Sequence, residues 1–185
     1  VANLSVSDED FGQNHAFSFN NVAGNDNALF NIVGDKLRTK ANFDYESQHQ
    51  YFIYIQVDDL NGGTFSKQFT IEIKDANDAP TDITLSTQSV NENRPISSFV
   101  ANLFTSDQDA NDSFTYNLVS GVGDADNANF FIRNDSLFTQ QVLSLNAQAS
   151  HSIRIQSNDG NGGLYSKAVS LTVKDINDVP TDILL

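Results

Sequence analysis

The 185-residue chain has no cysteine, tryptophan or methionine and only three prolines. Without cysteine it has no disulfide framework, no thiolate metal site and no cysteine nucleophile. Basic residues are also scarce, with 10 Lys and Arg against 24 Asp and Glu and a formal net charge of −14. Such a chain repels nucleic-acid phosphates and gains nothing from an anionic lipid surface. No apolar run approaches the roughly 20 residues of a membrane span, so we expect neither nucleic-acid binding nor direct membrane insertion.

The chain repeats itself with a period close to its half-length. Four pairs of blocks recur in the same order: Lys74–Ile83 and Lys174–Ile183 at an offset of 100, Asn61–Gly63 and Asn161–Gly163 at 100, Asp8–Asp10 and Asp107–Asp109 at 99, and Asn14–Phe19 and Asn111–Tyr116 at 97. Small insertions between such blocks are what surface loops tolerate. We therefore expect a first repeat over 1–80 that lacks its opening strand, a second over 81–180, and the start of a following repeat over 181–185.

Apolar and polar residues alternate in both repeats, over residues 68–73 and 168–173 and over residues 53–57. Period-two alternation indicates strands with one buried and one wet face. The Asn-Gly-Gly segments between consecutive strands are hairpin signals, because Asn and Gly tolerate positive φ. No stretch favours a helix. The pattern predicts an all-β chain of two tandem Greek-key antiparallel β-sandwich domains of the immunoglobulin-like type.

Acidic residues gather where the first repeat ends and the second begins. Asp75-Ala76-Asn77-Asp78 places three side-chain oxygen ligands within four residues, and Asp107-Gln108-Asp109 follows an early strand of the second repeat. Asp44 and Glu46 lie two residues apart, so they would face the same side of an extended segment. Calcium takes roughly 6–8 such oxygen ligands. The pattern therefore predicts a metal site at the joint, with solvated acidic turns as the alternative.

Together these blocks resemble the cadherin repeat family. That family has an early Asn/Glu-rich block, an Asp-x-Asp, a Leu-Asp-x-Glu, a single Asp after a late strand and a closing Asp-x-Asn-Asp-x-Pro. The chain carries similar blocks at Val90–Pro95, Asp107–Asp109, Phe43–Glu46, Asp59 and Asp159, Asp75–Pro80 and Asp175–Pro180. The resemblance covers nearly the whole chain. It implies cadherin-like domains outside the cell or on its surface that bind Ca²⁺ and are not enzymes.

The resemblance also implies which residues bind Ca²⁺. At the joint these would be Asp44, Glu46, Asp75, Asn77 and Asp78 with the carbonyls of Ala76 and Ala79 from the first repeat, and Asp107, Asp109, Asp159 and the carbonyl of Asn111 from the second. Two terminal half-sites are implied as well: Asp8, Asp10, Asn14 and Asp59 toward a preceding repeat, and Glu92, Asp175, Asn177 and Asp178 toward a following one. The early Glu of the first repeat is missing, so we expect the joint to bind fewer ions or to bind them more weakly.

One departure from the family pattern lies in the second repeat. Leu145-Asn146-Ala147-Gln148 stands where the family has Asp-x-Glu, and we interpret it as two carboxylates replaced by amides. Ligand charge sets much of the affinity for Ca²⁺. The substitution therefore predicts a weaker site at the C-terminal joint than at the joint between the two repeats.

Competing functions fit the sequence poorly. An EF-hand starting at Asp107 has Asp112 where it needs glycine and Leu118 where it needs glutamate. The three histidines are scattered, and no hydrolase or nucleotide motif is complete, so no enzyme class is indicated. Two binding roles remain. The first is a calcium-stiffened adhesion or spacer rod, whose partners are neighbouring repeats and another surface protein. The second is a calcium-dependent carbohydrate-binding module for a polysaccharide. The absence of Trp favours the rod, and the acidic, cysteine-free composition favours a bacterial-type surface protein.

Overall fold

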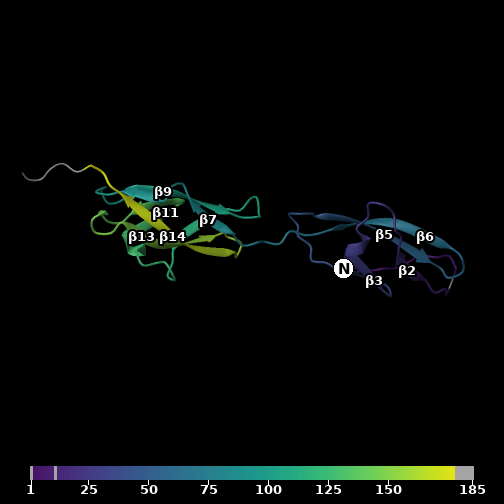
Figure 1. The fold of residues 1–185 in the computed structure, drawn as a ribbon. Helices are drawn as coiled ribbons and strands as arrows, with labels where there is room; N and C mark the ends of the chain where they lie inside the picture. Colours follow the sequence, from purple (N-terminus) through teal and green to yellow (C-terminus); the bar gives the residue numbers. More distant parts are fainter. Residues whose placement is uncertain (1, 11, 178–185) are drawn as a thin grey trace, which may run out of the picture. The chain divides into compact units, whose positions relative to one another are not determined.

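The computed structural model describes residues 2–10 and 12–177, and the chain divides into two compact units between Ala76 and Asn77. The boundary falls just before Pro80, where the first repeat was expected to end. Both units are built from strands, as expected (Figure 1). Helical structure in the described part is limited to the short 3₁₀ turns η1 (Asn27–Leu29) and η2 (Asn127–Asn129). None of the described helices has the length and apolar character that a membrane crossing requires.

The second unit is a sandwich of two four-stranded sheets. Its strands are β7 (Asp82–Leu85), β8 (Ser89–Asn91), β9 (Phe99–Ser106), β10 (Thr115–Leu118), β11 (Phe130–Arg133), β12 (Ser136–Thr139), β13 (Ser150–Asn158) and β14 (Leu164–Lys174). One sheet has the order β10-β13-β14-β8 and the other β11-β12-β9-β7. All pairs are antiparallel except β8 with β14. The chain changes sheets at every connection except those from β11 to β12 and from β13 to β14, which gives the expected β-sandwich with Greek-key connections.

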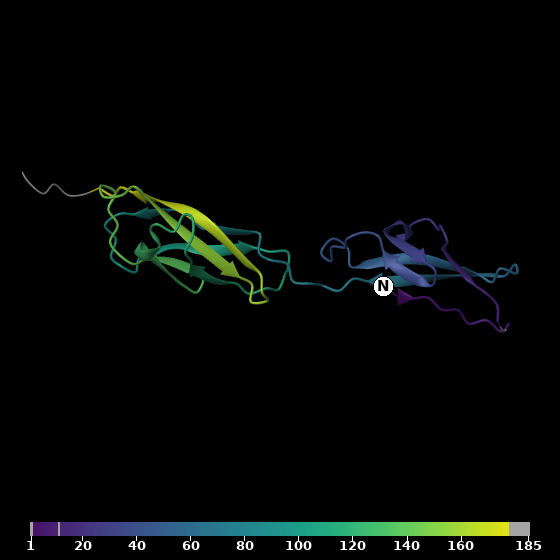
Figure 2. The ribbon, with the colours of Figure 1, turned by 90° about the horizontal axis from the view of Figure 1, so that it is seen from below.

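The first unit repeats this plan with fewer strands. They are β1 (Ala2–Asn3), β2 (Ala16–Phe19), β3 (Phe30–Val33), β4 (Lys36–Thr39), β5 (Gln50–Asp58) and β6 (Thr64–Glu72). The sheets β1-β4-β3 and β2-β5-β6 match β9-β12-β11 and β10-β13-β14 of the second unit. Residues 2–10 and 12–76 contain no counterpart of β7 or β8. Figure 2 shows the purple segment after β1 continuing as irregular chain.

Because the first unit lacks counterparts of β7 and β8 in its described residues, its core is less well buried than that of the second unit. In the second unit, β7 and β8 flank β14, and the side chains of Val169, Leu171 and Val173 are at most 4 % exposed. In the first unit, the equivalent Phe69 is 38 % exposed and Ile71 is only half-buried. Burial of apolar surface is the main driving force of folding. The first unit therefore lacks a share of the stabilisation that the second unit has.

The strand register corrects one of the sequence matches. Phe17 pairs with Val57 in the first unit, and Tyr116 pairs with Ser157 in the second. Phe17 therefore corresponds to Tyr116 at an offset of 99, and the offset of 97 for this block was wrong. A strand slipped by two residues keeps the same side chains on the inner face, so alternation does not reveal such an error.

An asparagine, buried in the first unit and half-buried in the second, ties a loop to a strand in each unit. Asn127 Oδ1 accepts the backbone N–H of Arg154 at 2.9 Å, and its Nδ2 donates to the Val119 carbonyl at 3.0 Å. Asn27 makes the same two contacts in the first unit. Because these bonds satisfy partly buried backbone groups, the side chain fixes the path of the chain into η2.

We expect Asn127→Ala to lower the free energy of unfolding by about 1–3 kcal/mol, because it leaves the partly buried backbone N–H of Arg154 without its acceptor. Urea denaturation followed by circular dichroism measures the loss. Asn117→Ala, on an exposed position of β10, is the control and should change stability by less than about 0.5 kcal/mol. An equally small effect of Asn127→Ala would contradict the role given to this side chain.

Candidate metal centre

Three carboxylates of the second unit converge at one end of its sandwich. Asp107 follows β9, Asp112 lies in the loop to β10, and Asp159 directly follows β13. One carboxylate oxygen of each lies within 4.8 Å of the others. Asp159 is only 2 % exposed, and the other two are half-buried. Three like charges thus share a space that water reaches poorly.

The loop after β13 is folded around Asp159. Its Oδ1 accepts backbone N–H groups from Asn161 at 2.7 Å, Gly162 at 3.0 Å and Gly163 at 2.9 Å. A Cβ atom on Gly163 would overlap the Asp159 carboxylate and the Cα of Ala79, so only glycine fits there. The pKa of Asp159 is lowered, first by the hydrogen bond from the Asn77 side chain and then, against the cost of burial, by these backbone N–H groups. The carboxylate is therefore held in its charged form.

The residues that follow Ala76 belong to the second unit and are held against its carboxylates by hydrogen bonds. Asn77 Nδ2 donates to Asp159 Oδ2 at 2.9 Å, and the backbone N–H of Asp78 donates to Asp109 Oδ2 at 2.8 Å. Ala79 lies against Gly163. The structure thus brings together six of the residues expected at the joint, Asn77, Asp78, Ala79, Asp107, Asp109 and Asp159. Asn111 is exposed on the loop between Asp109 and Asp112.

Two oxygen atoms of this group have no partner. Asp107 Oδ2 and Asp112 Oδ2 are buried and make no hydrogen bond. Burial raises the pKa of Asp112, as do the charges of Asp109, Asp159 and Asp107, in that order. Buried oxygens without hydrogen bonds are costly unless a cation or a proton meets them. A set of hard carboxylate and amide oxygens fits Ca²⁺. Asp112 was not among the residues expected here, since its only signal in the sequence is its closeness to the Asp-x-Asp.

The raised pKa of Asp112 predicts how acid affects the metal-free protein. A carboxyl whose pKa is higher folded than unfolded favours folding fully below its unfolded pKa, near 3.8, and this contribution is lost as the pH rises through the folded pKa. In EDTA, Asp112→Asn should therefore gain stability relative to the parent as the pH rises from about 4 to 7. Thermal unfolding at several pH values measures this. If the stability of Asp112→Asn relative to the parent stayed constant or fell as the pH rises, the proposed repulsion among these carboxylates would be contradicted.

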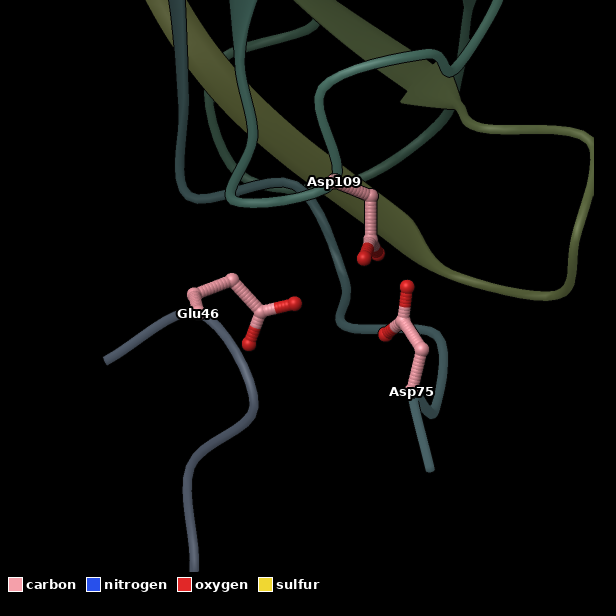
Figure 3. A group of neighbouring side chains, drawn as sticks. All are labelled: Glu46, Asp75 and Asp109. Carbon is pink, nitrogen blue, oxygen red and sulfur yellow. The ribbon is translucent and has the colours of Figure 1, made fainter. Parts of the chain in front are cut away.

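The first unit contributes acidic residues close to its last residue, Ala76. Carboxylate oxygens of Glu46 and Asp75 lie within 4.8 Å of each other. Figure 3 draws these two side chains on the loops of the first unit that carry them, and Asp109 on its loop in the second unit. The oxygen pair of Glu46 and Asp75 is a second place where like charges gather and where a cation would relieve repulsion.

The backbone around Asp44 has a different conformation from the expected extended one. Residues 45–47 form a turn, so the expectation of an extended segment with Asp44 and Glu46 on one side was wrong. Asp44 Oδ1 accepts the N–H of Glu46 at 3.1 Å, and Oδ2 accepts the hydroxyl of Ser47 at 2.8 Å. The Ser47 hydroxyl is the largest cause of the lowered pKa of Asp44. Asp side chains readily cap turns in this way.

The structure also corrects the departure found in the second repeat. The side-chain amides of Gln48 and Gln148 each donate to the carbonyl two residues later, at 2.7 and 2.8 Å, so these two residues correspond. Ser144 and Asn146, and not the amides at 146 and 148, then stand at the Asp and Glu positions of the first repeat. The second repeat therefore still lacks both carboxylates, but Ser144 replaces the Asp with a hydroxyl and Asn146 replaces the Glu with an amide.

The half-site at the start of the first unit has a related geometry. Asp8 Oδ2 lies 2.9 Å from His15 Nε2, and Asp59 Oδ1 accepts N–H groups of Asn61 and Gly63, both at 2.8 Å. The Asn61 N–H is the largest cause of the lowered pKa of Asp59, and the charge of Asp8 opposes it. Asp8 and Asp59 are therefore close enough for their charges to repel each other. The other two residues expected here, Asp10 and Asn14, are exposed.

The half-site at the end of the second unit is only partly described. Glu92 is 3 % exposed, and its Oε2 accepts the N–H of Leu145 at 2.9 Å. This bond is the largest cause of its lowered pKa, and a hydrogen bond with Asp175 also lowers it. Asn177 is exposed. Asp178 and the expected start of a following repeat at 181–185 lie outside the described residues.

Comparisons with known proteins agree with the resemblance. No family model matches the chain. It is 23 % identical to human Cadherin-12 over 202 residues, which cover 99 % of the chain and 25 % of the relative. It is 30 % identical to the Drosophila melanogaster Protocadherin-like wing polarity protein stan over 193 residues, which cover 96 % of the chain and 5 % of the relative. The chain thus spans a quarter or less of the length of these curated relatives.

A solved structure shows the same fold. The human Protocadherin-24 EC1-2 structure superposes with a TM-score of 0.73 at 19 % identity and covers 95 % of this chain and 88 % of that one. The relatives are cadherins and protocadherins, in agreement with the prediction that the chain is not an enzyme. They come from animals, and the bacterial-type origin stays a prediction. By its sequence relatives and its β-sandwich fold, the chain belongs to the cadherin-like repeat family.

Proposed function

We propose that Ca²⁺ binds at the joint between the two repeats and stiffens it. The observation that carries this proposal is the carboxylate group of Asp107, Asp112 and Asp159, where two buried oxygens lack hydrogen-bond partners. Asp75 and Asn77 belong to different units but are two residues apart, which limits their Cα separation to about 7 Å. One set of ions therefore has ligands available from both repeats.

The proposed mechanism is electrostatic. Without metal, the carboxylates of the two repeats repel one another, and the short connection acts as a hinge. Bound Ca²⁺ reverses the sign of these interactions and ties residues of both repeats to one ion. Such an ion would take ligands from Glu46 and Asp75 of the first repeat and from Asp107, Asp109 and Asp159 of the second.

A calcium-stiffened joint fits a role in cell adhesion or as a rigid spacer outside the cell. The relatives are cadherins and protocadherins, and this likeness supports a location at the cell surface or outside the cell. A stiff joint lets neighbouring repeats project a distant contact surface away from the membrane. We propose neighbouring repeats and a second surface protein as the partners of this chain.

Small-angle X-ray scattering in EDTA and in millimolar Ca²⁺ tests the proposal. We expect Ca²⁺ to increase the maximum dimension and to narrow the spread of conformations. Asp109→Asn should weaken this response, because it removes charge at the joint. Asp135→Asn is the matched control, since Asp135 is exposed and far in sequence from the expected ligands. Scattering that is identical in EDTA and Ca²⁺ would refute a calcium-stiffened joint.

The C-terminal half-site is predicted to bind Ca²⁺ more weakly than the joint. The double substitution Ser144→Asp and Asn146→Glu restores both carboxylates that the first repeat has at these positions. We expect it to add a binding event or to tighten the weakest one by about tenfold, since ligand charge sets calcium affinity. Isothermal titration with Ca²⁺ measures the change. An unchanged titration would show that these two positions do not contribute ligands.

Polysaccharide binding is the second candidate, favoured by an aromatic patch on the second unit. Phe131 and Phe138 stack with ring centroids 5.3 Å apart, Phe99 lies 5.9 Å from Phe138 and is 52 % exposed, and Arg133 covers the Phe138 ring. Aromatic faces are platforms for sugar rings, although cross-strand aromatic pairs also stabilise sheets. Co-sedimentation with insoluble polysaccharides tests this role. Retention that Phe99→Ala abolishes and Val142→Ala leaves unchanged would support it, and no retention would exclude it.

A further inference from the structure

The second unit has a polar pocket lined by β8, the loop over residues 92–98 and the start of β9. Its volume is about 310 Å³, at the lower end of the roughly 300–1,000 Å³ that is common for ligand pockets. The lining residues are Ser89, Val90, Asn91, Arg94, Ser98 and Phe99. All of them belong to one unit, in which both sheets have four strands. The pocket is therefore part of a closed sandwich.

The loop that forms one wall of this pocket is held by hydrogen bonds. The backbone N–H of Ser97 donates to the Thr139 carbonyl at 2.8 Å, and the Ser98 hydroxyl donates to the Pro95 carbonyl at 2.7 Å. Ser97 has a φ of 64°, in the left-handed region that residues other than glycine rarely adopt. Such a conformation persists only where the surroundings impose it. The wall is therefore formed before any ligand arrives, which lowers the entropy cost of binding.

Phe99 forms an aromatic wall of the pocket. Its side chain is 52 % exposed, which is unusual for so large an apolar residue. Its ring meets that of Phe138 edge to face, with centroids 5.9 Å apart and an angle of 75° between the planes. This contact with β12 holds the ring in place beside the pocket. An exposed aromatic face of this kind is a platform for the C–H groups of a sugar ring.

Two polar side chains of the pocket are not engaged by the rest of the described chain. No ion pair among residues 2–10 and 12–177 includes Arg94, although acidic residues outnumber basic ones by 24 to 10. Within the same residues, the side chains of Arg94 and Asn91 make no hydrogen bond. A guanidinium is a planar fork of donors that matches an oxyanion, and an amide both donates to and accepts from hydroxyl groups. The pocket thus offers an anion-binding group and a hydroxyl-binding group beside an aromatic ring.

The net negative charge of the chain is remote from this pocket. Asp107 and the carboxylates around it lie beyond the far end of β9, about 20 Å away along the strand. Charges are screened over about 8 Å at physiological ionic strength. Closer to the pocket, the exposed charges of Lys174 and Asp175 offset each other, and Glu92 is 3 % exposed. An anion bound by Arg94 therefore escapes the repulsion of the joint carboxylates.

We propose that this pocket binds an acidic sugar unit of a polysaccharide, one that carries a carboxylate or a sulfate. The inference rests on the polysaccharide-binding candidate above and names its ligand class. Phe99 stacks on the apolar face of the sugar ring, Asn91 bonds its hydroxyls, and Arg94 takes the anionic group through two hydrogen bonds. Arg133, which lies over the Phe138 ring, provides a second cation for a neighbouring acidic unit of the same polymer.

Isothermal titration of the full chain with a galacturonic acid trimer and with its methyl ester, in millimolar Ca²⁺, tests the proposal. The ester keeps the sugar rings and removes the negative charges. We expect the acid to bind at least about tenfold more tightly than the ester, and Arg94→Gln to remove this difference. Arg94→Lys should keep only part of it, because an ammonium lacks the planar fork. Arg38→Gln, the same change at an exposed position of β4, is the control.

Two further probes separate the possible ligands. A sulfated galactose trimer tests the other source of the anion: binding as tight as that of the acid shows that both anions fit, and weaker binding assigns the pocket to carboxylates. A glutamic acid trimer has carboxylates but no sugar ring, and we expect it to bind at least about tenfold more weakly than the sugar acid. Equal binding of the two would assign the pocket to acidic peptides and overturn the proposal.

Other outcomes also decide against an acidic sugar. Equal binding of the galacturonic acid trimer and its ester, or a preference that Arg94→Gln leaves intact, would overturn this inference and leave the polysaccharide-binding candidate standing. No binding of any trimer would overturn the inference as well. The co-sedimentation with insoluble polysaccharides described above then decides separately on the polysaccharide-binding candidate.

Discussion

Ca²⁺ is expected to raise the midpoint of thermal unfolding of this chain by roughly 5–10 °C. A ligand that binds only the folded state stabilises it by about 2.7 kcal/mol at a hundredfold excess over its dissociation constant. For a protein of this size about 1 kcal/mol moves the midpoint by roughly 2–4 °C. Differential scanning calorimetry in EDTA and across a Ca²⁺ series measures the rise, which should continue with the logarithm of the free Ca²⁺ concentration.

Asp107→Asn should remove most of this rise. The substitution keeps the shape of the side chain but removes the charge beside its buried, unpartnered oxygen. In EDTA the same variant should be at least as stable as the parent, because one of the crowded charges is gone. Asp135→Asn should behave as the parent in both conditions. If Asp107→Asn responded to Ca²⁺ as strongly as the parent, the metal would have to bind elsewhere.

Truncating apolar side chains on the inner faces of β14 and β6 should lower stability by different amounts. Leu171→Ala should lower the free energy of unfolding by about 2–5 kcal/mol, the cost of an apolar cavity in a closed core. Leu171 is fully buried, whereas its counterpart Ile71 is half-buried. Ile71→Ala should therefore cost about half as much, since water already reaches part of the site. Urea denaturation followed by circular dichroism measures both losses.

Leu164→Ala is the control for these two substitutions. Leu164→Ala removes the same atoms as Leu171→Ala from an exposed position of the same strand and should change stability by less than about 0.5 kcal/mol. If Ile71→Ala cost as much as Leu171→Ala, the Ile71 side chain would be as fully shielded from water in solution as that of Leu171.

The fold was largely predictable because it depends on signals that are local in sequence. Period-two alternation located β5, β6, β13 and β14, and the repeated Asn-Gly-Gly blocks located the hairpins that join them. These features follow from how side chains alternate across a strand, and no distant contact overrides them. The repeat itself supplied the two-domain plan.

The site was predictable only where a motif names its residues. Asp107, Asp109 and Asp159 were found through the family pattern, and the structure places them together. Asp112 was missed, because it approaches the others through a loop whose path is not encoded by spacing. Asp44 was misplaced, because a hydrogen bond to Ser47 turns the chain where an extended segment was expected. Such local side-chain bonds compete with extended structure and leave little trace in periodicity.

The hydrogen bonds that hold Asn77 and Asp78 on the second repeat shorten the tether between the repeats almost to nothing. With so short a tether, the carboxylates of the first repeat stay at a millimolar or higher effective concentration around those of the second. If the joint binds Ca²⁺ as proposed, a modest intrinsic affinity on each side then suffices for strong binding. The same logic makes the length of residues 75–77 as important as their identity, because each inserted residue would dilute one half of the site from the other.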